Sequence, residues 1–199
     1  VQFVAFPATL LWGYVADKYG DKLVLGKPIG MGIYSSALRS KALSDEQYSL
    51  MLKYGTQLNS IGYDMSLLNC VSAITDVTGF GLAGHAWEIA KGSKRDIRIF
   101  FNKVPFFPDI KDLISQGYIT GASQKNLMSF KDKVTFNSRF SVKERKLLFD
   151  PQTSGGLLIS VKSNYLENIL KEFDKQGYQA VEIGEVLKKT KIEPSVFVD

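Results

Sequence analysis

Strand-like and helix-like segments alternate along this sequence, and their spacing is irregular. Short apolar runs that predict strands occur at residues 23–25, 156–161 and 180–187. Between them, apolar residues recur at helical spacing, as in the segment that follows Ser44. This pattern favours an α/β (α+β) fold with a mixed β-sheet flanked by helices, rather than a regular doubly wound parallel sheet.

One expected helix affects how a nearby motif is interpreted. Residues 63–73 carry apolar side chains at helical spacing, so we expect Leu67, Leu68 and Val71 to face inward. A glycine-rich turn at residues 76–81 then leads into another helix. On this interpretation a helix, and not a strand, precedes the glycine-rich turn.

The first 22 residues differ in character from the rest. Residues 1–15 are mostly apolar or aromatic and carry no charge. A membrane-spanning helix needs about 20 such residues, so this run is too short alone and membrane association is disfavoured. The tail of a longer span, an interfacial anchor and a buried helix stay open as interpretations of it. Residues 13–22 resemble a cytoplasmic loop of major facilitator transporters, while a helix packed on the core is the alternative. We therefore expect a foreign-looking segment at 1–22 and one domain at 23–199. Because the chain begins with Val1, we also expect a fragment or a processed product.

Charge and composition exclude several classes of function. The net charge is +5, from 25 basic and 20 acidic residues that are mostly interspersed. Nucleic-acid binding requires clustered positive charge, so we expect no nucleic-acid partner. One cysteine and one histidine exclude an internal disulfide and any metal site built from several Cys or His residues. A lone cysteine favours a reducing, cytoplasmic setting.

The first candidate site is the segment 75–85, which reads TDVTGFGLAGH. Its glycines match Gly-x-Gly-x-x-Gly, the pattern of dinucleotide-binding turns. That function needs a strand before the turn and an acidic residue at the end of the next strand. We expect a helix before the turn, and the next strand ends in Phe-Phe-Asn. Dinucleotide binding is therefore disfavoured.

Within this segment, Asp76 has two interpretations. A carboxylate just before a helix can cap that helix, and residue type alone favours this role. Alternatively, Asp76 is a ligand of Mg²⁺, which prefers hard oxygen donors and bridges them to phosphates. Thr78 contacts the same ion or a phosphate, or shares in the cap. His85 is expected to be a packing residue on the following helix.

The second candidate site is the segment 150–156, which reads DPQTSGG and precedes an apolar strand. Two hydroxyl residues and two glycines in this place can form a nest of backbone N–H groups that holds an anion. A tight turn into a core strand is an equally good interpretation. Lys27, in the segment GKPIGMG, either contacts a phosphate or is an exposed lysine at a strand end, and the second case is the commoner one.

Taken together and in this order, the motifs resemble the C-terminal half of the selenide, water dikinase (selenophosphate synthetase) family. The matching strings are LGKPIGMGI at 25–33, TDVTGFGL-x-GH at 75–85, GAS-x-x-N at 121–126 and DPQTSGGLL at 150–158. The resemblance covers about residues 20–199. It implies the fold of the aminoimidazole-ribonucleotide-synthetase-like superfamily and an ATP-dependent synthesis of selenophosphate from selenide and water.

The resemblance also implies roles for individual residues. Asp76 would match a carboxylate that binds Mg²⁺ at the ATP phosphates, and this shifts its interpretation from cap to ligand. The residues expected to contact the nucleotide are Thr78, Gly79, Gly81, Thr153, Ser154 and Gly155. Phosphoryl transfer depends mostly on positioning and on neutralising charge, which Mg²⁺ and a fixed carboxylate supply together. No catalytic residue is assigned within this chain.

The N-terminal half of the family, with its reactive Cys or selenocysteine, catalytic Lys and further metal carboxylates, has no counterpart in this sequence. We therefore expect little or no turnover from this chain alone. A homodimer is a further expectation from the family. Two alternatives stay open: a non-catalytic remnant that binds nucleotides or anions, and a superfamily relative that acts on another substrate.

Overall fold

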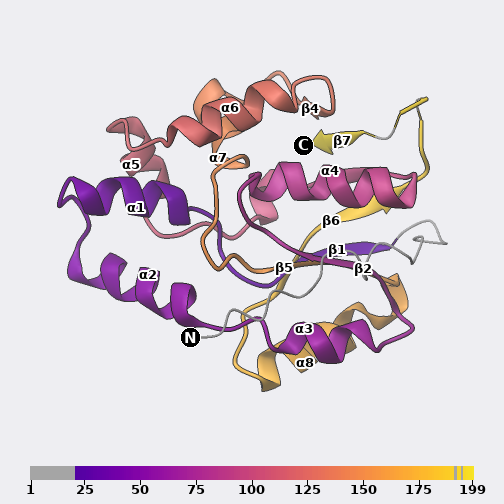
Figure 1. The fold of residues 1–199 in the computed structure, drawn as a ribbon. Coiled ribbons are helices and arrows are strands. Elements are labelled where there is room, and N and C mark those ends of the chain that lie inside the picture. Colours follow the sequence, from indigo (N-terminus) through magenta and orange to yellow (C-terminus); the bar gives the residue numbers. More distant parts are fainter. Residues whose placement is uncertain (1–20, 191, 194) are drawn as a thin grey trace.

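The computed structural model describes residues 21–190, 192–193 and 195–199, and its architecture is a seven-stranded sheet flanked by helices (Figure 1). The foreign-looking segment expected at 1–22 lies outside the described residues, apart from Asp21 and Lys22. The strands are β1 (Lys22–Leu25), β2 (Val71–Asp76), β3 (Asp96–Ile99), β4 (Val134–Phe136), β5 (Leu157–Val161), β6 (Val181–Leu187) and β7 (Val196–Val198). The helices are α1 (Met31–Arg39), α2 (Asp45–Thr56), α3 (Ile61–Ser66), α4 (Gly81–Ser93), α5 (Ile110–Ser115), α6 (Gly121–Ser129), α7 (Val142–Leu147) and α8 (Leu166–Lys175), with short 3-10 turns η2 (Phe101–Lys103) and η3 (Ser163–Tyr165).

The sheet is mixed, as the sequence predicted. Its strand order is β2-β5-β1-β6-β3-β7-β4. The pairs from β2 to β3 are antiparallel, whereas β7 runs parallel to both β3 and β4. Strand β1 lies between β5 and β6, so the strand that begins the described chain occupies the interior of the sheet.

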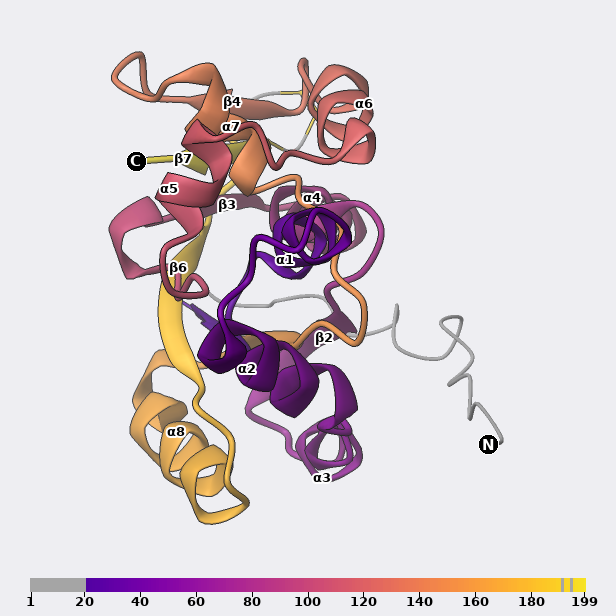
Figure 2. The same cartoon turned by 90° about the vertical axis from the view of Figure 1, so that its left-hand side faces the viewer.

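Helices cover both faces of the sheet. Along β1, Leu23 and Leu25 face one core while Val24 faces the other, as the alternation of side chains in a strand requires. The first core packs under α1, α2, α4 and α5, and the second packs under α3 and α8. Figure 1 and the rotated view in Figure 2 place α4 and α8 on opposite sides of the sheet. Every residue of β5 is buried, because this strand is covered on both faces.

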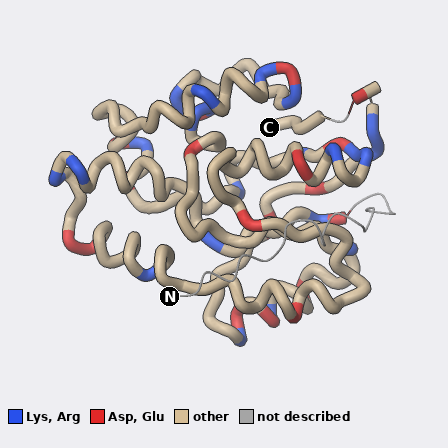
Figure 3. Tube along the Cα trace, in the orientation of Figure 1, with Lys and Arg blue, Asp and Glu red and all other residues tan. Residues whose placement is uncertain are grey.

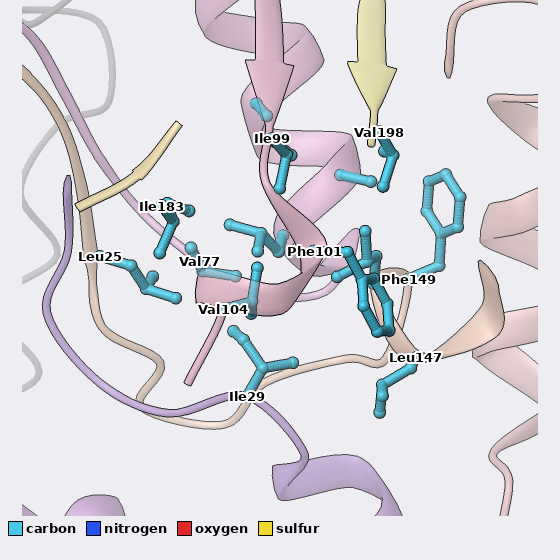
Figure 4. Close-up of a cluster of buried hydrophobic side chains, with 14 of the residues drawn as sticks. Leu25, Ile29, Val77, Ile99, Phe101, Val104, Leu147, Phe149, Ile183 and Val198 are labelled. Atoms are coloured by element: carbon cyan, nitrogen blue, oxygen red, sulfur yellow. The ribbon is translucent and has the colours of Figure 1, made fainter. Parts of the chain in front are cut away.

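The larger core joins segments that are far apart in the sequence. Figure 4 shows Leu25, Val77, Ile99, Phe149 and Val198 converging in it from different elements. Val77, in the TDVTGFG segment at 75–81, is fully buried. The candidate site is therefore anchored directly to the core.

The prediction of a helix at residues 63–73 is wrong. Helix α3 ends at Ser66, and the strand β2 begins at Val71. Leu67 and Leu68, expected to face inward, are 65% and 39% exposed. The β-branched residues of β2 pair with the apolar strand β5, and this long-range partner overrides the local helical spacing.

Basic and acidic positions occur over the whole described trace (Figure 3). Within the described residues, no helix has both the length and the apolar character needed to cross a membrane.

Candidate functional site

The two candidate segments lie side by side at one end of the neighbouring strands β2 and β5. Asp76, the last residue of β2, is paired with Leu157, the first residue of β5. The N–H of Val77 donates to the carbonyl oxygen of Gly156 (2.9 Å), and the N–H of Gln152 donates to that of Thr78 (3.0 Å). The fold therefore brings together the residues that the sequence assigned to the site: Asp76, Thr78, Gly79 and Gly81 on one turn, and Thr153, Ser154 and Gly155 on the adjoining loop.

The turn between β2 and α4 packs against Phe149, which immediately precedes the second loop (residues 150–156). Gly81 has φ +70°, and a Cβ at this position would lie 2.6 Å from the backbone of Phe149. The side-chain amide of Asn126 donates to the carbonyl oxygens of Gly79 (2.8 Å) and Phe149 (3.1 Å). Gly79 itself is exposed, with no atom within 4 Å of a hypothetical Cβ. Gly81 thus shapes the turn, whereas Gly79 borders open space.

Asp76 does not cap the following helix. The residue before α4 is Phe80, and no side chain caps this helix. Asp76 is exposed, and its carboxylate makes no hydrogen bond or ion pair with any other described residue. The capping interpretation is therefore wrong, and the carboxylate is available to a ligand from outside the described chain.

Thr78 is linked through His85 to Glu88. The Thr78 hydroxyl lies 3.1 Å from His85 Nε2, and Glu88 Oε2 lies 2.8 Å from Nδ1 of the same ring. The second contact has the distance of an ion pair, at an angle outside hydrogen-bond geometry. His85 is 7% exposed, and the centre of its ring lies 5.8 Å from that of Phe80. The expectation that His85 is a packing residue holds for its burial but omits its contacts through both nitrogens.

The second loop turns its carbonyl groups into the protein. Three successive carbonyl oxygens, those of Ser154, Gly155 and Gly156, accept hydrogen bonds. The donors are, in order, Lys27 Nζ (2.8 Å), Asn59 Nδ2 (2.8 Å) and Val77 N (2.9 Å).

Three backbone N–H groups of the same loop have no hydrogen-bond acceptor among the described residues: those of Thr153, Ser154 and Gly155. The side chains of Thr153 and Ser154 are exposed, and Ser154 has φ +52°. A loop with its carbonyls satisfied and its amides unpaired has the polarity of an anion-binding nest.

Lys27 is not the exposed lysine that the sequence favoured. It is 2% exposed, and its ammonium donates to the carbonyl oxygens of Gln57 (2.6 Å), Ser154 (2.8 Å) and Tyr54 (3.4 Å). Burial lowers its pKa from the ordinary 10.5 to about 8. The ammonium therefore joins the C-terminal end of α2 to the second loop. It is fully occupied by these carbonyls.

Asp150 and Gln152, at the start of the second segment, are structural residues that the sequence did not single out. Asp150 Oδ2 accepts the N–H groups of Gly32 (2.9 Å) and Ile33 (3.3 Å) at the start of α1. Gln152 Oε1 accepts those of Gly30 (3.2 Å) and Met31 (3.1 Å). These side chains fill the N-terminus of α1, where orphan donors need partners. A Cβ at Gly32 would lie 2.5 Å from Asp150, which a local pattern does not reveal.

Among the described residues, Asp76 is the carboxylate that this site offers to a metal ion. No group of three or more His, Cys, Asp or Glu residues among the described residues could bind one. Asp76 is a single exposed carboxylate. Mg²⁺ commonly uses one or two protein carboxylates together with water and substrate phosphates, so this donor set fits a shared metal site and not a self-sufficient one.

The glycine-rich turn does follow a strand, contrary to the expectation for residues 63–73. It still lacks the arrangement of a dinucleotide site. The sheet neighbour of β2 is β5, which runs antiparallel to it, and β3 lies elsewhere in the sheet. After β3 come Phe100, Phe101 and Asn102, with no carboxylate. The parallel strand–helix–strand unit that positions a dinucleotide is therefore not formed here.

Comparison with known proteins gives one consistent family. Residues 18–196 match the family described as AIR synthase related protein, C-terminal domain. The chain is similar to proteins named selenide, water dikinase: 42% identical over 182 residues in Pseudomonas straminea (91% of this chain, 50% of the relative) and 40% identical over 169 residues in Paraburkholderia xenovorans (84% and 48%). The chain thus spans about half the length of the curated relatives it matches.

Solved structures of the same fold are more distant in sequence. Escherichia coli HypE has a TM-score of 0.67 at 20% identity, over 96% of this chain and 50% of that protein. Thiamine-monophosphate kinase from Stenotrophomonas maltophilia has a TM-score of 0.60 at 14% identity, over 96% and 52%. The hydrogenase maturation protein HypE in complex with ATP has a TM-score of 0.60 at 16% identity, over 87% and 44%. At these identities the likeness establishes the fold.

Proposed function

We propose a function from the premise that this chain belongs to the AIR synthase related protein family, of which it carries the C-terminal domain. The proposed function is that of the C-terminal half of a selenide, water dikinase. Such an enzyme transfers phosphoryl groups from ATP to selenide and water, giving selenophosphate, phosphate and AMP. The observation that carries the proposal is the junction of two specific motifs, where the unpaired carboxylate of Asp76 lies beside the unpaired amides of residues 153–155.

In this proposal the chain binds and orients the nucleotide phosphates. The free N–H groups of the second loop and the turn at Thr78 and Gly79 contact phosphate oxygens. Asp76 supplies one ligand to Mg²⁺, which neutralises the phosphate charge when it is bound. Phosphate oxygens and the N-terminal half of such an enzyme supply the other ligands. The identity of 37–42% to several selenide, water dikinases supports this assignment over other superfamily substrates.

We find no match in this chain for the reactive Cys or selenocysteine of the family. Cys70 is the single cysteine, and it is buried just ahead of β2, away from the exposed Asp76 end of that strand. We therefore propose that this chain alone gives little or no turnover, and that the N-terminal half of the enzyme completes the site. From the family we also propose a homodimer, and from the lone cysteine a cytoplasmic location.

Calorimetry with ATP and Mg²⁺ tests the binding role. The wild-type chain is expected to bind Mg²⁺–ATP, and Asp76→Asn to weaken this binding about tenfold, because the amide retains a neutral oxygen but loses the charge that Mg²⁺ prefers. The exposed Asp174→Asn in α8 is the control, with unchanged affinity. Equal affinities for wild type and Asp76→Asn would contradict the role of Asp76 as a ligand.

Phosphorus NMR of the wild-type chain with ATP and selenide tests the second part. No selenophosphate signal is expected from the chain alone. The appearance of that signal would show that this half is sufficient and would overturn the proposed need for an N-terminal half.

A further inference from the structure

The contacts among Thr78, His85 and Glu88 constrain where the ring proton of His85 and the hydroxyl hydrogen of Thr78 lie. Glu88 Oε2 stands 2.8 Å from His85 Nδ1, and an ionised carboxylate can only accept a hydrogen or attract a positive end. The angle of this contact is outside hydrogen-bond geometry, so the preference is electrostatic: a bare Nδ1 carries partial negative charge and is repelled by the carboxylate, whereas a protonated Nδ1 is attracted to it. The carboxylate therefore selects the ring form that carries its proton on Nδ1.

The state of Nδ1 decides the direction of the second contact. With the proton on Nδ1, the other nitrogen of a neutral ring has only a lone pair. The 3.1 Å contact between His85 Nε2 and Thr78 Oγ1 must then be a hydrogen bond that the threonine donates. A hydroxyl has one hydrogen, so none is left for another acceptor. Its oxygen keeps lone pairs, to which no described residue donates a hydrogen bond.

We propose that Glu88 and His85 are positioning residues that fix the Thr78 hydroxyl with its hydrogen toward His85, so that Thr78 meets its ligand only as an oxygen donor to a cation or as an acceptor from bound water. This rests on the proposed function for the nature of the ligand, Mg²⁺–ATP. It separates the roles of the two loops: the turn that carries Asp76 and Thr78 serves the cation, and the amides of residues 153–155 serve the phosphates.

The ring form can be measured directly, because His85 is the single histidine of the sequence. A long-range ¹H–¹⁵N correlation spectrum of the labelled chain in alkaline buffer reports which ring nitrogen carries the proton, and it needs no assignment. The expected pattern is that of the Nδ1–H form. Glu88→Gln should shift the population toward the Nε2–H form, since a neutral amide no longer favours a proton on Nδ1. The exposed Glu167→Gln in α8 is the matched control and should leave the spectrum unchanged.

The pattern of the Nε2–H form, or of a doubly protonated ring, in the wild-type chain would overturn the proposal. This result does not depend on ligand binding. It therefore decides the direction of the hydroxyl even if the chain binds no nucleotide, which would count against the proposed function alone.

Calorimetry then tests the role of the fixed oxygen. Thr78→Val keeps the shape of the side chain but removes the hydroxyl, and we expect it to weaken ATP binding about tenfold with Mg²⁺ and to leave binding without Mg²⁺ unchanged. Thr78→Ser should restore the affinity, and Thr135→Val on the exposed face of β4 is the control. An equal loss with and without Mg²⁺ would show that Thr78 donates to a phosphate and would overturn the proposal.

Discussion

The ammonium of Lys27 donates a 2.8 Å hydrogen bond to the backbone carbonyl oxygen of Ser154, a residue 127 positions further along the chain. The same ammonium holds two carbonyl oxygens at the end of α2. A buried cation thus neutralises the negative end of a helix and fixes the loop that carries the free amides. The conformation of the proposed phosphate-binding loop depends on this one side chain.

Replacing Lys27 with Met is expected to destabilise the fold by about 2–4 kcal/mol, because three carbonyl groups lose their shared donor. Hydrogen exchange should accelerate at residues 153–156 and at the end of α2. Denaturant unfolding and exchange mass spectrometry measure the two effects. Lys162→Met is the control, since Lys162 donates to a single carbonyl, that of Asn69, at an exposed position. Similar losses in both variants would contradict a special role for Lys27.

Gly155→Ala is expected to destabilise the chain by about 1–3 kcal/mol, because overpacking forces the backbone apart. Its Cβ would overlap the carbonyl oxygen of Val77, and that strand end cannot move without disturbing the core. Thermal unfolding measures the loss. Gly121→Ala at the start of α6, where no atom lies within 4 Å, serves as the control. The control should be neutral or stabilising, and an equally neutral Gly155→Ala would refute the packing of the two loops.

Asn126→Asp is expected to cost about 2 kcal/mol of stability, because an amide that donates to two carbonyl oxygens becomes a carboxylate that repels both. The variant should also loosen the turn at Gly79 and weaken nucleotide binding. Unfolding in urea and calorimetry measure these effects. Asn164→Asp, on the exposed turn η3, is the matched control. Wild-type behaviour of Asn126→Asp would show that the amide is dispensable for the turn.

Asp150 is expected to make stability depend on pH. Burial raises its pKa from 3.8 to about 7, against the lowering effect of its donors Gly32, Gln152, Ile33 and Ser123. Below about pH 3 the group is protonated in both the folded and the unfolded chain. Between about pH 4 and pH 7 the unfolded chain has released this proton while the folded chain retains it, so the stabilisation contributed by protonated Asp150 is lost progressively over this range.

Asp150→Asn removes this titration. The unfolding free energy of the variant relative to wild type should therefore rise by about 1–3 kcal/mol between pH 4 and pH 7. Urea unfolding across this range measures it, with the exposed Asp132→Asn as the control. A difference that stays constant with pH would mean that the donors to Asp150 outweigh its burial.

The local patterns predicted those parts of the fold whose partners are near in sequence or whose composition is extreme. The capping box at Ser44 is present: the Ser44 hydroxyl oxygen accepts the backbone N–H of Gln47, and Gln47 Oε1 accepts the backbone N–H of Ser44. The apolar run of residues 157–161 is the buried strand β5. The two motif segments were correctly predicted as turns at the ends of elements, because glycine and hydroxyl residues have few other uses there.

The failures have a common physical origin in distant partners. Residues 71–76 form a strand because β5 lies beside them, and local periodicity contains no trace of that strand. Lys27 is buried because three carbonyl groups from α2 and the second loop surround it. The contact between His85 and Glu88 could have been predicted from the sequence, since the two residues are three positions apart on one helix and therefore adjacent.

Because β1 lies in the interior of the sheet, it can pair with its neighbours only late in the synthesis of the chain. This strand pairs with β5 and β6, which are synthesised long after it, so the two antiparallel ladders around it close only when residues 157–187 are available. Contacts between such distant segments form slowly, because closing the long intervening loop costs conformational entropy before the contacts can stabilise the chain. During synthesis, β1 stays an unpaired apolar segment. A chaperone that binds nascent chains is therefore expected to contact residues 22–25 until β6 has emerged.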